Sequence, residues 1–372
     1  MGRQMQPMGK RRQFLLRGAS LVPAWLLPLG SIGAALAQAK QATVGLELDL
    51  STRTRDAGRA IEEGVRAALQ RAGSSAPLRI LDTQGNLARA LDGLTDIATG
   101  EPILAIIGGG DGNVSAHVME WAEVNQVPYG IAWASNVSMQ RASRWSFTLG
   151  FSDERGITTA VKVARLRERQ RWGFLLSNDA LGRASYDAVL GLMATPIAPD
   201  LVGIQWHDVF AQSIGAQYLR LQQQGAQAIW LSGHPRAARQ LADAMQRQMQ
   251  TKSLTPVMAS SSTWNAEFAA LAQSHFGSVP LYFELPEFGK LSSGPAGQNP
   301  AWMHPANTNA DELLTAMLQV TGKKQQDLSL QRAAIARAWG ELQLKQRSTP
   351  MAMYHYDGRG QLVRTPPSRI FA

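Results

Sequence analysis

The sequence predicts an α/β fold of two domains, each built on a mostly parallel sheet that is covered by helices. Short apolar or β-branched runs alternate with amphipathic helical stretches, a pattern typical of parallel strands joined by crossover helices. The pattern runs to about residue 133 and starts again at Trp172. Since the chain has 372 residues, it is also longer than one hydrophobic core usually holds, and two domains are expected.

The first set of elements begins at Thr43. Thr43–Leu48 is the first expected strand, and a helix follows over 56–71, where apolar residues recur three and four positions apart. The run Ile103–Ile107 is apolar throughout, as expected for a strand covered on both faces. The other elements expected in this set are strands 78–81 and 127–133 and helices 86–99 and 114–125.

The second set alternates in the same way, with strands 172–176, 201–206, 228–231 and 256–259 and helices 183–193, 214–224 and 236–250. An extended, proline-containing segment over 280–289 follows, and then a loop over 291–305 that is rich in Gly, Pro, Ser and Asn. Helices are expected again over 310–320 and 328–344. A hairpin of strands 351–356 and 361–363 is expected to end the chain, with its turn at Asp357-Gly358.

The first 37 residues are typical of an export signal. The run KRRQFLL at 10–16 contains paired arginines, and the mildly apolar stretch after it ends in the small-x-small triplet Ala35-Leu36-Ala37. This combination predicts a twin-arginine signal peptide over 1–37. A transmembrane anchor is the alternative, but Pro23 and Pro28 interrupt a stretch that is shorter than the roughly 20 apolar residues of a spanning helix. We therefore expect a periplasmic protein with no stable membrane insertion after cleavage.

The charge of the chain does not indicate a nucleic-acid partner. The signal segment carries five of the 37 basic residues and none of the 28 acidic ones, so its removal lowers the formal net charge from +9 to +4. No later run of Lys and Arg is interleaved with aromatic residues. Nucleic-acid binding is therefore excluded from the expected functions.

Residue types that carry catalysis or bind metals are sparse. The chain has no cysteine, and its six histidines are scattered singly, so no metal site is expected. Neither a G-x-S-x-G motif nor a paired-carboxylate motif occurs. We expect a binding protein without a cofactor rather than an enzyme.

Several local motifs occur in an order that resembles the branched-chain amino-acid-binding proteins of ABC transporters, a class of type I periplasmic binding proteins. They are VGLELDL at 44–50 with the helix after it, the strand ending in Leu81-Asp82-Thr83, NQVP at 125–128, RWGFLLSNDALGRAS at 171–185, QGAQAI at 224–229 and YHYDGRGQLV at 354–363. The resemblance covers nearly all of 42–372. It implies two Rossmann-like lobes joined by three crossovers, with lobe I over 42–150 and 288–345 and lobe II over 151–287 and 346–372.

The resemblance also implies a function. Such proteins close their lobes around a small polar solute, here an amino acid, an amide or a carboxylate, and deliver it to an inner-membrane ABC permease. The alternative is a periplasmic ligand-sensing component of a signalling or regulatory system.

The ligand of an open α/β sheet binds beyond the carboxyl ends of the strands. In lobe I this rule selects two loops, whose expected ligand-binding residues are Gly110, Asp111, Asn113, Trp133, Ser135 and Asn136. The run Gly108–Gly112 fits a tight turn. It fits equally an anion site in which the backbone amides of Asn113 and Val114 face the ligand.

In lobe II the same rule selects Asp179, Leu181, His234 and Ser261. In the family a carboxylate pairs with the α-ammonium of the substrate, and none is found at the Ser261-Ser262 loop. Asp111 and Asp179 are either substitutes for it or solvated loop residues. Trp133 and Trp264 are either cleft-lining or packing residues, and His234 is either a polar contact of a lid or an ordinary loop histidine.

Overall fold

Two sheets organise the residues that the computed structural model describes. These residues are 42–134, 143–150, 152–249, 253–264, 268–277, 279–286, 305–321, 327–348 and 350–371. The expected signal peptide over 1–37 therefore lies outside the described residues. Both sheets belong to one compact unit that spans residues 41–372.

The first sheet is parallel throughout and has the strand order β2-β1-β3-β4-β5. Its strands are β1 (Thr43–Leu48), β2 (Leu78–Asp82), β3 (Ile103–Gly108), β4 (Tyr129–Ile131) and β5 (Ser146–Thr148). Every residue of β1 and β3 is buried, as the apolar run at 103–107 predicted for a strand covered on both faces. Its helices are α1 (Arg55–Ala72), α2 (Leu87–Gly100), α3 (Gly112–Asn125), α9 (Pro305–Thr321) and α10 (Leu328–Arg347).

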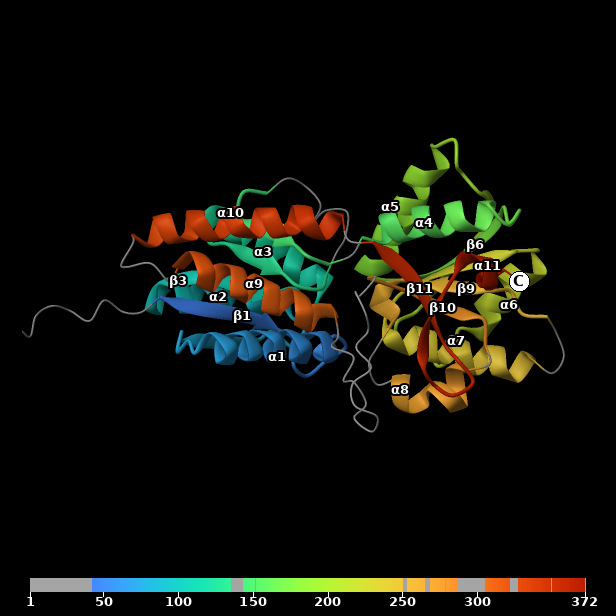
Figure 1. The fold of residues 1–372 in the computed structure, drawn as a ribbon, viewed down its shortest axis with the longest axis horizontal. Helices are drawn as coiled ribbons and strands as arrows, with labels where there is room; N and C mark the ends of the chain where they lie inside the picture. Colours follow the sequence, from blue (N-terminus) through green and yellow to red (C-terminus); the bar gives the residue numbers. More distant parts are fainter. Residues whose placement is uncertain are drawn as a thin grey trace, which may run out of the picture. The chain divides into compact units, whose positions relative to one another are not determined.

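Helices from distant parts of the sequence cover the first sheet together. One apolar core joins β1 to α1, α9 and α10, and a second joins β3 and β4 to α2 and α3. Figure 1 shows α1 and α9, from opposite ends of the described sequence, side by side. A Cβ at Gly64 of α1 would lie 2.2 Å from the carbonyl oxygen of Asn307 in α9, so only glycine permits this close approach.

The second sheet has the order β12-β11-β10-β9-β8-β6-β7. Strand β11 runs antiparallel to both of its neighbours, β10 and β12. Its strands are β6 (Arg171–Ser177), β7 (Asp200–His207), β8 (Ala228–Ser232), β9 (Val257–Ala259), β10 (Leu281–Pro286), β11 (Met351–Tyr356) and β12 (Leu362–Thr365). Its principal helices are α4 (Asp153–Arg165), α5 (Ala180–Met193), α6 (Gly215–Gln223), α7 (Pro235–Gln248), α8 (Phe268–Leu271) and α11 (Pro367–Ile370).

Successive side chains of the second sheet enter different cores. Leu175 and Leu231 pack with α6 and α7, whereas Phe174 and Trp230 pack with α4 and α5. This alternation follows from the period of two in a strand. The chain passes between the sheets three times, after β5, after β10 and after α10. The predicted two-lobed α/β fold is therefore confirmed.

The described elements depart from the expected ones in several places, and the short helix α8 (Phe268–Leu271) is one that was not predicted. β4 covers three residues instead of the predicted seven, and its pairing with β3 ends where Ile131 lies opposite Gly108. β5 and α4 were not predicted; three residues are too few for β5 to show an alternation. The hairpin does not end the chain, since the short helix α11 follows it. Among the described helices, none combines the length and hydrophobicity needed to cross a membrane.

Candidate functional site

A cavity of about 620 Å³ lies at the carboxyl ends of the parallel strands of both sheets. In the first sheet its walls are the loops after β1, β3 and β4. In the second they are the loops after β6, β7, β8 and β9 and the start of α4. This is the position that strand direction alone selects for a ligand in open α/β sheets, and we call it the cleft.

The structure brings eight of the ten expected ligand-binding residues together in the cleft wall. They are Gly110, Asp111, Asn113, Trp133, Asp179, Leu181, His234 and Ser261. Ser135 and Asn136 lie outside the described residues. The role of these residues in binding stays a prediction. Trp264 is a packing residue: it is 2% exposed, and its Nε1 donates to the hydroxyl of Tyr356 at 3.3 Å.

Asp111 fills the expected anion site at the start of α3 with its own carboxylate. Its Oδ1 accepts the backbone N–H of Asn113 at 2.8 Å and that of Val114 at 3.3 Å. Its Oδ2 accepts from Arg53 at 2.7 Å, and the side chain is 2% exposed. Asp111 is therefore a helix cap and an ion-pair partner rather than a solvated loop residue, and these amides are not available to a ligand.

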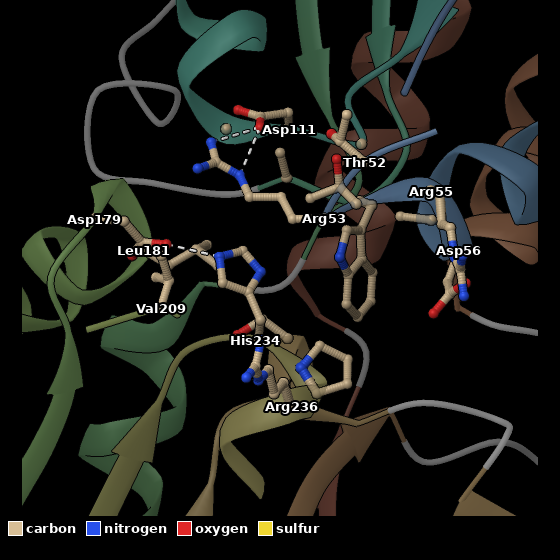
Figure 2. Close-up of a pocket in the computed structure, with 18 of the residues that line it drawn as sticks. Thr52, Arg53, Arg55, Asp56, Asp111, Asp179, Leu181, Val209, His234 and Arg236 are labelled. Atoms are coloured by element: carbon tan, nitrogen blue, oxygen red, sulfur yellow. Dashed lines mark hydrogen bonds and ion pairs between the residues drawn. The ribbon is translucent and has the colours of Figure 1, made fainter. Parts of the chain in front are cut away.

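The Arg53 that neutralises Asp111 comes from the loop after β1. Asp49 follows directly after β1, and its carboxylate accepts hydrogen bonds from the backbone N–H of Thr52 at 2.8 Å and of Thr54 at 3.1 Å. These bonds turn the chain so that Arg53 reaches across to α3, and Figure 2 shows its guanidinium directed at Asp111. Sequence reasoning missed Arg53, because an arginine in a Ser/Thr-rich loop has no distinctive spacing.

Asp179 and His234 form the corresponding pair on the second sheet. His234 Nε2 lies 2.7 Å from Asp179 Oδ2, and the two side chains are 16% and 9% exposed (Figure 2). Asp179 Oδ1 also accepts from Ser177 Oγ at 2.6 Å and from the N–H of Gly182 at 3.1 Å. Burial raises the pKa of Asp179, but these hydrogen bonds and the His234 charge outweigh it and hold the pKa well below its ordinary value. Asp179 is thus ionised and partnered.

Asp153, the first residue of α4, is a cleft residue that sequence reasoning missed. Its Oδ2 accepts from the hydroxyl of Ser232 at 2.9 Å and from the hydroxyl of Ser185. Burial raises the pKa of Asp153, while the two hydroxyls lower it and Asp179 raises it further. No element at 150–165 was expected from the sequence, so nothing there indicated a site.

The rest of the cleft wall combines arginines with apolar side chains. Arg55 lies 3.5 Å from Asp56, and Figure 2 shows both at the start of α1. Arg236 and Arg239 stand on the first turns of α7 and have no ion-pair or hydrogen-bond partner among the described residues. The apolar part of the wall consists of Trp133, Leu181, Val209, Phe210, Phe268 and Leu271. Such a wall suits a small ligand that has both charged and apolar parts.

Comparison with known proteins gives a family and a fold. A family model described as "Periplasmic binding protein" matches residues 41–341. None of the curated protein sequences is significantly similar to the chain. Among solved structures, the leucine-binding protein LivK of Thermotoga maritima is 15% identical with a TM-score of 0.68, and the match covers 87% of this chain and 98% of LivK.

Two further solved structures were found with their ligands. LivJ of Streptococcus pneumoniae, in complex with isoleucine, is 14% identical with a TM-score of 0.66, and the match covers 88% of this chain and 100% of LivJ. A solute-binding protein of an ABC transporter from R. palustris, in complex with benzoate, is 14% identical with a TM-score of 0.68 and covers 87% and 94%. At these identities the likeness shows the fold. Together with the family match and the cleft at the strand ends of two mostly parallel sheets, it establishes that the chain belongs to the periplasmic binding protein family, with the two-lobed type I fold.

Proposed function

We propose that this protein captures a small polar solute in the cleft and delivers it to an ABC permease in the inner membrane. The observation that carries the proposal is the cleft itself, whose wall takes residues from the carboxyl strand ends of both sheets. A ligand held there contacts both lobes, so its binding free energy favours any arrangement in which the two walls approach. The expected ligand is an amino acid, an amide or a carboxylate.

The chemistry of the cleft supports this class of ligand. Close contacts with Arg53 and His234 fix the positions of Asp111 and Asp179 before a ligand arrives, so polar contacts with their neighbours require little reordering. The neighbouring apolar side chains suit a hydrocarbon part. The proteins of the same fold described above bind leucine, isoleucine and benzoate, which combine a carboxylate with an apolar body.

The proposal includes an export route and lobe boundaries. A twin-arginine signal over 1–37 would place the protein in the periplasm, where such a receptor meets its solute. Lobe I would comprise 42–150 and 288–345, and lobe II 151–287 and 346–372. Three connections between the lobes would then act as the hinge around which the cleft closes.

A thermal-shift screen of the purified protein against amino acids, amides, short carboxylates and aromatic acids tests the binding function. A ligand at 100 times its Kd adds about 2.7 kcal/mol to the free energy of unfolding, which gives a clear rise in melting temperature. No rise with any of these classes would contradict the proposal.

A variant pair tests whether the binding occurs in the cleft. Asn113 is exposed in the cleft wall, and its side chain has no hydrogen-bond partner among the described residues. Asn113→Ala should weaken binding of a ligand found in the screen about five- to tenfold, the worth of one hydrogen bond. Asn125→Ala makes the same change at the opposite end of α3 and should leave the affinity unchanged. Equal affinities in both variants would contradict this placement of the ligand.

A further inference from the structure

The carboxylates of the cleft wall differ in whether they have a cationic partner. Asp111 pairs with Arg53, Asp179 with His234, and Asp56 lies beside Arg55. Asp153 is the exception: among the described residues it has no salt bridge. Asp153 is only partly exposed, and a desolvated carboxylate without an opposite charge is costly, so this position requires an explanation.

The contacts of Asp153 leave one of its oxygens free. The hydroxyl groups of Ser185 and Ser232 both donate hydrogen bonds to its Oδ2. Oδ1 has no hydrogen-bond partner in the described part of the chain, although Asp153 lines the cleft. Burial raises the pKa of Asp153, and the two hydroxyl donors oppose that rise because they favour the ionised form. Both donors bind Oδ2, so Oδ1 is left for another donor.

Two further carboxyl groups, those of Glu284 and Asp179, lie close enough to Asp153 to interact with its charge. Burial raises the pKa of Glu284, and the charge of Asp153 raises it further, while Arg155 lowers it. Together these effects raise the pKa of Glu284 to about 8. Asp179 in turn raises the pKa of Asp153. A cation placed at Asp153 would therefore stabilise the ionised forms of neighbouring carboxyl groups as well.

We propose that Asp153 pairs with a cationic nitrogen of the ligand and makes the cleft selective for amines. This inference rests on the proposed binding function. Asp153 lines the cleft from the start of α4, where its Oδ1 can accept a hydrogen bond from a cationic nitrogen. Arg236 and Arg239, also without partners among the described residues, line the same cleft and suit an anionic group of the ligand.

Matched ligand series test this assignment on the purified protein by thermal shift and calorimetry. One series shares the leucine skeleton: leucine, 4-methylpentanoate and isopentylammonium. The other shares the phenylalanine skeleton: phenylalanine, 3-phenylpropanoate and phenethylammonium. The compounds with an ammonium group should bind about 10- to 100-fold more tightly than the carboxylate of the same skeleton that lacks it.

The variant Asp153→Asn should remove this preference and retain the fold, because an amide oxygen can still accept the two serine hydroxyls. Asp187→Asn removes the same charge from an exposed position of α5, outside the described cleft wall, and should keep the wild-type preference.

The outcomes separate the inference from the function on which it rests. Loss of the ammonium preference in Asp153→Asn alone supports the inference. Equal binding of ligands with and without the ammonium group, or equal losses for both in Asp153→Asn, overturns it and leaves the binding function standing. If neither series nor the wider screen contains a ligand, both proposals are overturned.

Discussion

Glu47 is the buried carboxyl group on which the glycine loop of the cleft rests. Its Oε2 accepts the backbone N–H of Gly109 at 2.9 Å and the hydroxyl of Tyr129 at 2.8 Å. Its Oε1 has no partner among the described residues. Burial raises the pKa of Glu47, and the charges of Asp111 and Asp49 raise it further. The two hydrogen bonds lower it, and the pKa is about 7. The loop that carries Asp111 therefore rests on a group that titrates near neutral pH.

The raised pKa of Glu47 predicts a loss of stability with rising pH. A carboxyl group whose pKa is higher in the folded than in the unfolded state contributes stability that is complete below the unfolded value of about 4.5 and is lost as the pH rises through about 7. Glu47→Gln removes this titration. The free energy of unfolding, measured by urea denaturation between pH 5 and 8, should fall in the wild type by a component on the order of 3 kcal/mol that the variant lacks.

Two comparisons show whether the pH dependence of the unfolding free energy comes from Glu47. Burial raises the pKa of Glu284 to about 8, so Glu47→Gln should retain the decline that Glu284 contributes across the whole range. Glu63→Gln, at an exposed position of α1, should follow the wild-type curve. Parallel curves for Glu47→Gln and the wild type would show that Glu47 is not the titrating group.

The first turn of helix α3 is held by Asp111, a residue of the cleft wall. Asp111 caps its first turn and also pairs with Arg53, so a substitution there removes two interactions. Asp111→Ala should lower the free energy of unfolding by about 1–2 kcal/mol, chiefly through the lost cap. The ion pair adds less, because the Arg53 side chain is 32% exposed and solvent screens it.

Asp111→Ser separates the cap of α3 from the ion pair. A serine hydroxyl can accept the same backbone amides but carries no charge, so this variant should regain most of the stability that Asp111→Ala loses. Urea denaturation at pH 7 measures both. If serine is as destabilising as alanine, the contribution of Asp111 lies in its pairing with Arg53 instead.

At the level of elements, the sequence predicts what is local. The apolar run of β3 and the periodic face of α1 each lie within one segment, and both were located within two residues. The loops of the cleft follow from strand direction alone, which is why eight expected residues meet there. β5 is too short to leave a pattern.

The pairings inside the cleft could not be read from the sequence. Arg53 meets Asp111 across 58 positions, and Asp153 meets Ser185 and Ser232 across 32 and 79. No local spacing records such contacts, because they arise only when loops from separate strands converge. The same reason made Asp111 and Asp179 resemble solvated loop residues, although both are buried and paired.

At the scale of the molecule, each sheet has hydrophobic cores of its own. Leu46 of β1 packs in a core with α1, α9 and α10, and Leu175 of β6 packs in a core with α6 and α7. Both leucines are almost fully buried. Elements that share a core tend to open together, so separate cores predict that each lobe loses protection as a unit.

A pair of leucine truncations tests this division and the proposed lobe boundaries. Leu46→Ala and Leu175→Ala should each cost about 2–5 kcal/mol of stability, because each leaves a cavity in a packed core. Hydrogen exchange followed by mass spectrometry then shows which segments of each variant exchange their backbone amides faster than in the wild type. In Leu46→Ala exchange should rise in segments 43–134, 305–321 and 328–347, and in Leu175→Ala it should rise in 171–248 and 351–365. Helices α9 and α10 decide the outcome, because they follow lobe II in sequence and share a core with β1. Faster exchange of these helices in Leu175→Ala, or an equal rise throughout both variants, would show that the lobes do not divide as proposed.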